Sequence, residues 1–331
     1  MIITKNQEEF CYSGFNPDCE GEQLCDLNDA GEERPWRAKR LATELLAMVY
    51  DSVDDAKANR LRGCATQLGF AVLDGGKKRL KEANFCRVRL CPMCTWRRSL
   101  KVYGQARQII DTLDDYCFVF ATLTIKNVKG EDLSEAIDSL FSAWNRFYRK
   151  TRIVRAWRGG MRTLEVTHNV NPASRDYDTY HPHLHILAAV RKSYFRGRDY
   201  ISQADYTDMW RDAAQLSYTP VVHVEKCKST TSAALAECCK YAVKDTDYIL
   251  PDDWDLSIDT VRTLNSALHG RRLVSWFGVF ADARKNLKLD DAENGNLVSV
   301  DGNDETADVA QEMIYYAWCG GYSQYRRRRE F

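Results

Sequence analysis

Between residues 180 and 190 the chain first alternates histidine with apolar residues and then becomes apolar throughout, which predicts a buried β-strand. Successive side chains of a strand point to opposite faces, so His181, His183 and His185 would share one face. Residues two apart lie roughly 6.5 to 7 Å apart along a strand, and two neutral imidazoles at that spacing can bind one divalent ion. The segment is therefore a candidate metal-binding strand, and hydrogen-bonded core histidines are the alternative.

Similar alternation predicts further strands, and apolar residues at helical spacing predict several helices. The expected strands cover residues 116–125, 162–167, 221–224 and 274–280. One expected helix begins at residue 35, and the others cover residues 95–113, 133–148, 202–216, 233–244 and 254–268. No internal repeat accompanies this order of elements.

One carboxylate is a candidate third ligand beside the histidine strand. In the expected strand 162–167, Glu165 shares a face with Thr163 and Thr167. If this strand pairs with the histidine strand in antiparallel fashion, Glu165 can face the same side as His183 and His185. An inward-facing acid at the centre of a strand is costly unless it is paired. A site of two histidines and one acid for a divalent metal ion is the interpretation that we favour.

A second candidate metal site lies upstream, in the most basic part of the chain. Cys91-Pro-Met-Cys94 is a C-x2-C motif, and Cys86 and Cys64 precede it. Four thiolates are the number that a closed structural zinc site requires, whereas reduced structural thiols are the alternative. Trp96 lies among several arginines, a combination that suits contact with nucleic-acid phosphates and bases; these arginines are Arg87, Arg89, Arg97 and Arg98.

The expected helix 233–244 carries three polar residues at helical spacing. Glu237 and Tyr241 are four residues apart, and Lys244 follows three residues later, so all three would form one stripe on the helix. The Ser and Thr residues that precede the helix suit an N-cap.

Composition and charge limit the class of protein. With 331 residues, 44% of them hydrophobic, the chain can form one large domain or two of ordinary size. Its net charge is zero, but residues 8–33 and 290–308 are acidic, whereas residues 60–101 and 326–329 are basic. This distribution permits local binding to a polyanion. The N-terminus is polar, and no apolar run approaches the roughly 20 residues of a membrane helix. We therefore expect a cytoplasmic protein without a membrane partner.

Four motifs in order resemble those of plasmid rolling-circle replication initiators, which belong to the HUH endonuclease group. The block from Phe85 to Arg98 also resembles the cysteine block of the replication proteins that use a single catalytic tyrosine. The resemblance covers about residues 60 to 285. The four motifs are Phe120-Ala-Thr-Leu-Thr124, Glu165-Val-Thr167, His181-Pro-His-Leu-His185 and Glu237-x3-Tyr241-x2-Lys244.

The resemblance implies an α+β fold in which a central antiparallel sheet carries the histidine strand and is flanked by helices, with a small four-cysteine zinc module upstream. Composition and periodicity, together with this resemblance, predict four regions. They are an acidic, flexible extension over residues 1–33, a basic helical and zinc-binding module over 34–113, an HUH-type DNA-nicking domain over 114–285, and an acidic and then arginine-rich tail over 286–331.

The resemblance also implies a reaction, namely the nicking and joining of single-stranded DNA at a plasmid origin through a 5′-phosphotyrosine. Tyr241 would be the nucleophile, and Glu237 would activate water to end the cycle. Lys244 would neutralise a phosphate oxygen. Mg²⁺ or Mn²⁺ would be bound by Glu165, His183 and His185, and structural Zn²⁺ by Cys64, Cys86, Cys91 and Cys94. Single-stranded DNA and duplex origin DNA are the expected partners, and a host helicase and DNA polymerase are further candidates.

Two other classes of protein stay open. A transposase or conjugative relaxase of the HUH group would use the same metal and tyrosine on different DNA, although the cysteine block argues against it. A non-enzymatic, zinc-containing DNA-binding regulator would use the histidines structurally. For His181, metal ligation and contact with a phosphate or a metal ligand are equally open. The remaining three histidines, His168, His223 and His269, have no assigned site.

Overall fold

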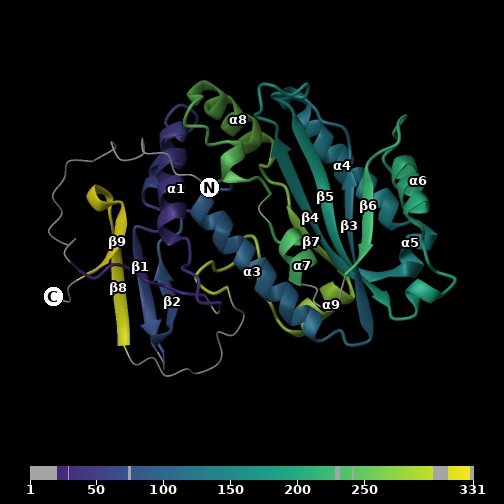
Figure 1. Cartoon of the computed structure of the whole chain (residues 1–331), viewed down its shortest axis with the longest axis horizontal. Coiled ribbons are helices and arrows are strands. Elements are labelled where there is room, and N and C mark those ends of the chain that lie inside the picture. The colour runs from purple at the N-terminus through teal and green to yellow at the C-terminus, as the bar shows by residue number, and fades with distance from the viewer. Residues whose placement is uncertain are drawn as a thin grey trace. The chain divides into compact units, whose positions relative to one another are not determined.

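The computed structural model describes residues 21–28, 30–73, 76–227, 232–240, 242–300 and 312–328 (Figure 1). The chain divides into two compact units. The first unit contains the described residues up to Cys94, residues 297–299 and the described residues from 312 onward. The second contains Thr95–Asn296 and residue 300. None of the helices in these described ranges is both long and apolar enough to cross a membrane.

The second unit is built on a five-stranded antiparallel sheet with the strand order β6-β3-β5-β4-β7. The histidine strand β5 therefore lies in the middle of the sheet, as the resemblance implied, and the α+β prediction is confirmed. The strands are β3 (Tyr116–Thr124), β4 (Trp157–His168), β5 (Tyr180–Arg191), β6 (Val222–Lys226) and β7 (Val274–Gly278).

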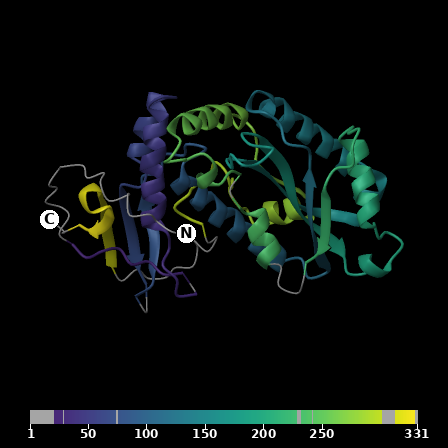
Figure 2. The same cartoon turned by 45° about the horizontal axis from the view of Figure 1, so that its top comes forward.

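Helices cover both faces of this sheet (Figures 1 and 2). Buried side chains of α3 (Pro92–Asp111), α7 (Ser232–Cys238) and α9 (Val279–Asn286) pack with Leu187 and Ala189 of β5. These two residues share the face of His183 and His185, so the histidines lie at one end of an apolar layer. The other helices of the unit are α4 (Leu133–Tyr148), α5 (Thr151–Ala156), α6 (Gln203–Ala213) and α8 (Trp254–Ala267), with short 3-10 helices η4 (Gly130–Asp132), η5 (Tyr194–Arg196) and η6 (Asp245–Asp247).

The first unit contains a second sheet, with four strands in the order β2-β1-β8-β9. Phe70 of β1 contacts both Trp36 of α1 and Tyr316 of β8 edge to face, with ring centroids 5.8 and 5.9 Å apart. The elements are α1 (Trp36–Tyr50), α2 (Asp55–Arg62), β1 (Gln67–Val72), β2 (Lys78–Ala83), β8 (Glu312–Cys319), η7 (Gly320–Tyr322) and β9 (Gln324–Arg327).

The structure differs from the sequence-based expectation near the C-terminus. The expected arginine-rich tail contributes β8 and β9 to the sheet of the first unit. Arg326 lies over the Tyr322 ring, and Arg327 pairs with Glu312 at 2.7 Å. Part of the segment expected as a tail therefore forms strands, and two of its arginine side chains contact residues of the same unit. Residues 1–20, part of the expected N-terminal extension, lie outside the described residues.

Candidate functional site

Three neighbouring strands bring candidate metal ligands onto one face of the central sheet. In the antiparallel register, Glu165 of β4 lies opposite His183 of β5, and Thr122 of β3 lies opposite His185. Residues two apart on a strand share a face, so the carboxylate and both imidazoles point to the same side. All three ligand candidates are buried.

The ligand atoms of these three residues converge. The Nε2 atom of His185 lies 2.8 Å from Oε2 of Glu165, and the Nε2 atom of His183 lies 3.5 Å from the same oxygen. One ligand atom from each residue lies within 4.8 Å of the others. The arrangement of two imidazole nitrogens and one carboxylate on one side of an ion is a recurrent divalent-metal site.

The other ring nitrogens hold the two imidazoles in place. The Nδ1 atom of His183 donates to the backbone oxygen of His181 at 3.0 Å. The Nδ1 atom of His185 lies 3.1 Å from the Thr122 hydroxyl, and the Phe120 ring stacks on the His185 ring at 5.4 Å. Such contacts orient a metal-binding histidine and direct its Nε2 lone pair toward the ion.

The histidines also determine the charge state of Glu165. Burial raises the pKa of this carboxyl, but hydrogen bonds and charge interactions with His183 and His185 outweigh burial and hold the pKa below its usual range. The carboxylate is therefore ionised at neutral pH, which is the form that binds a metal ion.

His181 differs from the other two histidines of β5. Its ring stacks on the His183 ring with centroids 5.1 Å apart, and its side chain interacts with the backbone of Ile125. Burial, followed by the neighbouring His183, lowers the pKa of His181. His181 does not belong to the three-residue group of ligand atoms among the described residues.

The segment that carries Glu237 and Lys244 is not one continuous helix. Helix α7 ends at Cys238, because the Cys239 amide is shared between the carbonyls of Leu235 and Ala236 and the Lys240 amide bonds to Glu237 only three residues back. This tightening of the last turn ends many helices. The Glu237 carboxylate pairs with Lys240, and the exposed Lys244 caps η6 instead of lying on α7. The expected single stripe is thus wrong for Lys244.

Tyr241 lies outside the described residues, but the chain that follows it is anchored to β4. The backbone amide of Val166 donates to the carbonyl oxygen of Ala242 at 2.7 Å. Ala242 directly follows Tyr241 in the sequence, and Val166 directly follows Glu165. A backbone hydrogen bond therefore ties the segment after Tyr241 to the strand that carries Glu165.

His168, to which the sequence pattern assigned no role, anchors the same segment a few residues later. Its Nδ1 atom lies 3.0 Å from the backbone oxygen of Asp247 in η6, and its Nε2 atom lies 3.0 Å from a carboxylate oxygen of Asp178. Its ring stacks on Tyr180 at 4.4 Å, and the Thr260 hydroxyl lies 3.4 Å from Nδ1. A histidine at the end of a strand, with a buried tyrosine opposite it, was the signal that could have pointed to a role for His168. The partner of His168 in η6, however, lies 79 residues away in the sequence.

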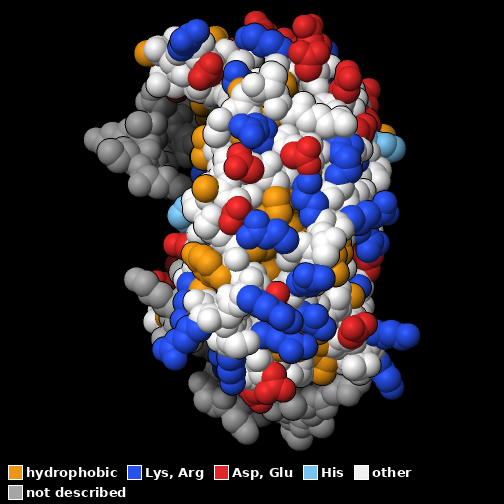
Figure 3. All heavy atoms as spheres, turned by 90° about the vertical axis from the view of Figure 1, so that its right-hand side faces the viewer, with side chains coloured by type: hydrophobic (Ala, Val, Ile, Leu, Met, Phe, Trp, Pro, Cys, Tyr) orange, Lys and Arg blue, Asp and Glu red, His pale blue; other side chains and the backbone are white. Residues whose placement is uncertain are grey.

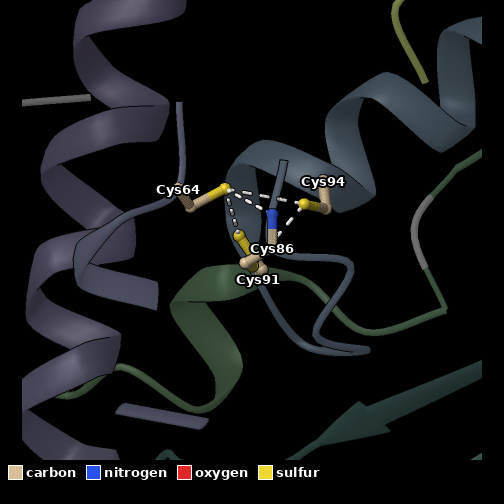
Figure 4. Close-up of side chains that lie close together, drawn as sticks. All are labelled: Cys64, Cys86, Cys91 and Cys94. Carbon is tan, nitrogen blue, oxygen red and sulfur yellow. Dashed lines mark hydrogen bonds between the residues drawn. The ribbon is translucent and has the colours of Figure 1, made fainter. Parts of the chain in front are cut away.

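Four cysteines of the first unit form a second group of candidate metal ligands (Figure 4). The Cys64 sulfur lies 3.6 Å from both the Cys91 and Cys94 sulfurs, and the Cys86 sulfur lies 3.7 Å from that of Cys94. Four sulfurs bound tetrahedrally at about 2.3 Å from a zinc ion lie about 3.8 Å from one another. The spacing of the thiols matches a closed tetrahedral site.

Backbone amides and a hydroxyl surround these sulfurs. The amides of Cys86 and Arg87 donate to the Cys64 and Cys94 sulfurs at 3.4 and 3.3 Å, and the Thr43 hydroxyl lies 3.7 Å from the Cys91 sulfur. Desolvation raises the pKa of the Cys91 thiol, but hydrogen bonds from the three other thiols outweigh it and lower that pKa. Hydrogen bonds with the other three thiols, followed by burial, raise the pKa of Cys64. A hydrogen bond with Cys64 lowers the pKa of Cys86, but hydrogen bonds with Cys91 and Cys94 and burial outweigh it and raise that pKa. Of these three thiols, only Cys91 is favoured as a thiolate, the form that binds metal.

Comparison with known proteins places the chain in a family. The Rep_1 family model, described as replication protein, matches residues 77–326. Protein rep of Bacillus amyloliquefaciens is 35% identical and the match covers 91% of this chain and 96% of that protein. Protein rep of Streptococcus pneumoniae serotype 2 is 34% identical, with 85% and 89% covered, and a replication protein of Staphylococcus aureus is 34% identical, with 61% and 86% covered. No solved structure matches the chain significantly.

The family match spans β4 and β5 with all three residues of the Glu165, His183 and His185 group, and it includes three of the four clustered cysteines, Cys64 lying outside it. The order of motifs along the chain and the position of β5 at the centre of the sheet agree with this match. The chain belongs to the Rep_1 family of replication proteins and is a plasmid replication initiator of that family.

Proposed function

We propose that the chain nicks and rejoins one DNA strand at a plasmid origin through a 5′-phosphotyrosine formed on Tyr241. The convergence of Glu165, His183 and His185 on one face of the sheet is the observation that carries this proposal. The hydrogen bond between Val166 and Ala242 supports it, because it holds the backbone next to Tyr241 against the strand of Glu165. Nucleophile and metal ligands would thus share one rigid support.

The residues of the triad suit a divalent ion. Both Nδ1 atoms are engaged in hydrogen bonds, so the two Nε2 atoms and one Glu165 oxygen are directed to a common point. When bound there, Mg²⁺ or Mn²⁺ supplies positive charge that polarises the scissile phosphate. The protein's part is to orient the ligands and to keep Glu165 ionised.

Tyr241 performs the covalent step in this account. Its phenol oxygen bonds to phosphorus as the bond to the 3′ oxygen breaks, and the phenol proton is transferred in the course of the step to the leaving 3′ oxygen. The 5′ end stays on the protein, and the free 3′-hydroxyl can prime synthesis by a host DNA polymerase behind a host helicase. Covalent catalysis of this kind conserves the energy of the phosphodiester bond.

Glu237 and Lys244 have supporting roles in the proposal. The Glu237 carboxylate, which pairs with Lys240, is the group that would accept a proton from water. Water activated in this way would hydrolyse a phosphodiester bond and end the cycle. The exposed ammonium of Lys244 is available to a phosphate oxygen of the DNA.

The Cys64, Cys86, Cys91 and Cys94 cluster would hold one structural zinc ion. The sulfur spacing and the amide donors support a closed site with four thiolates, which leaves no position for substrate. Zinc there would fix the turn before α3 and the basic segment around it.

Family membership favours a replication initiator over a transposase or relaxase. One substitution distinguishes the proposed nicking enzyme from a non-enzymatic DNA-binding regulator, because a protein that only binds DNA has no strand cleavage to lose. Wild-type protein and the Tyr241→Phe variant should be incubated with Mn²⁺ and labelled single-stranded fragments of the replicon that encodes the chain. Cleavage by the wild type and none by the variant is expected. Equal cleavage by both would refute the role of Tyr241.

A further inference from the structure

Four arginine side chains from separate elements of the second unit line one open hollow. They are Arg155 of α5, Arg158 at the start of β4, Arg191 at the end of β5 and Arg198 in the loop after η5. One acidic residue, Asp199, also lines the hollow. All five residues are exposed. Lys and Arg side chains gather in the lower half of the face that Figure 3 presents.

The charges of the four arginines are not neutralised within the described part of the chain, where none of them forms an ion pair or a side-chain hydrogen bond. Nearby basic residues behave differently, since Arg152 pairs with Asp205 at 3.0 Å and Lys150 pairs with Asp212. Four arginines and one aspartate give the hollow a charge of 4 − 1 = +3. Like charges gathered in this way repel one another and attract a polyanion.

We propose that this arginine cluster is a second contact site for the DNA backbone, separate from the nicking centre. The guanidinium group binds phosphate oxygens in a bidentate manner, and an open, exposed hollow suits a long polymer better than a small enclosed anion. The choice of DNA as the polyanion rests on the proposed function.

The position of the cluster excludes a direct part in the chemistry. Arg158 precedes Glu165 by seven residues on β4, and Arg191 follows His185 by six residues on β5. At about 3.3 Å per residue, these separations are about 20 to 23 Å. The cluster is therefore too far from the triad to touch the scissile phosphate, and it contributes to affinity and to placement of the flanking DNA.

The test is a salt titration of DNA binding. The Arg155→Gln/Arg191→Gln variant should be compared with wild type on a labelled duplex of the replicon between about 50 and 200 mM salt. Each lost phosphate contact lowers the slope of log affinity against log salt by about 0.9, so a decrease approaching 1.8 is expected. The matched control is Arg107→Gln/Arg211→Gln, which removes the same charge from two exposed arginines paired with Asp111 and Asp208. An equal slope for variant and control would overturn the proposal.

Two further measurements distinguish loss of the contact site from misfolding and from failure of the proposed function. Asp199→Asn removes the acid of the hollow and should strengthen binding, a gain that misfolding cannot produce; weaker or unchanged binding contradicts the proposal. At saturating protein, the Arg155→Gln/Arg191→Gln variant should cleave a short single-stranded fragment as fast as wild type. If the wild type fails to cleave while the salt slopes still differ, the proposed function fails and the DNA-contact site stands. If cleavage is present and the slopes agree, the contact site alone fails.

Discussion

At the scale of single residues, the grouping of the candidate metal ligands is the part of the site that the sequence predicted best. Alternation along one strand was enough to group His183 with His185, because side-chain direction in a strand depends only on position. The pairing of Glu165 with His183 needed one further assumption, namely that the two strands are antiparallel neighbours, and the structure has them so. His168 was missed because its partners come from a turn, a 3-10 helix and α8, which no local pattern connects.

Replacing either ligand histidine should abolish nicking. His183→Ala or His185→Ala removes a donor that has no substitute in the triad, so cleavage should fall by about 10³-fold or more, equivalent to about 4 kcal/mol of transition-state stabilisation. Duplex DNA binding should be largely unchanged. The exposed His269 provides the control, since His269→Ala should cleave normally. Chelation should stop the wild type and Mg²⁺ or Mn²⁺ should restore it, whereas full activity in excess chelator would exclude the metal centre.

Glu237 should act after the first cut. Glu237→Gln keeps the size of the side chain but removes the base, so it should nick at a rate comparable with wild type and then accumulate the covalent complex. Lys240→Ala removes the ion pair without removing the base and should still complete the cycle. Gel analysis of adduct and product over time distinguishes these outcomes. A Gln variant that fails already at the first cut would place Glu237 in nucleophile activation or metal binding instead.

His168 should act as a positioning residue. Loss of its hydrogen bonds to Asp247 and Asp178 would loosen the segment that follows Tyr241 and displace the nucleophile. We expect His168→Ala to slow single-turnover cleavage by up to about 100-fold with little change in DNA affinity. His168→Gln, which retains a donor, should recover part of the rate. A purely structural role predicts that rate and thermal stability fall in parallel in both variants.

At the scale of elements, patterns within one segment were predicted well and pairings between distant segments were not. The expected helix 133–148 coincides with α4, and the helix expected at 95–113 is α3. The second sheet was not predicted from the sequence, because β2 is mostly charged and because β1 pairs with β8, which follows it by more than 200 residues. Local periodicity carries no information about such partners. The expected helix 233–244 likewise did not anticipate that the chain at Ala242 bonds to Val166 of β4.

The cysteine cluster should behave as a structural element. Cys91→Ser should lower the zinc content of the purified protein and cost several kcal/mol of unfolding free energy, because binding energy at a structural zinc site is folding energy. The exposed Cys25, in the same unit, gives the matched control, since Cys25→Ser should leave metal content and stability unchanged. Elemental analysis and thermal denaturation measure the two effects. Wild-type protein purified without chelator and free of zinc would rule out a zinc site.

At the scale of the whole molecule, the net charge gave no indication of the basic cluster that we propose to contact DNA. The chain has 47 basic and 47 acidic residues, so its formal charge is zero. Two neighbouring basic residues form ion pairs, Arg152 with Asp205 and Lys150 with Asp212, whereas no ion pair involves the four arginines of the cluster among the described residues. The sequence could predict basic segments but not this cluster, because its members are brought together by the sheet and its helices.

The measurement that tests the central claim most directly is identification of the covalent adduct. Wild-type protein, Mn²⁺ and single-stranded fragments of the replicon should be incubated, digested with protease and nuclease, and examined by mass spectrometry. The account predicts a nucleotide attached through its 5′ phosphate to the peptide that contains Tyr241, and no such adduct in Tyr241→Phe, in His183→Ala or with chelator. Cleavage without an adduct, or an adduct on another residue, would contradict it.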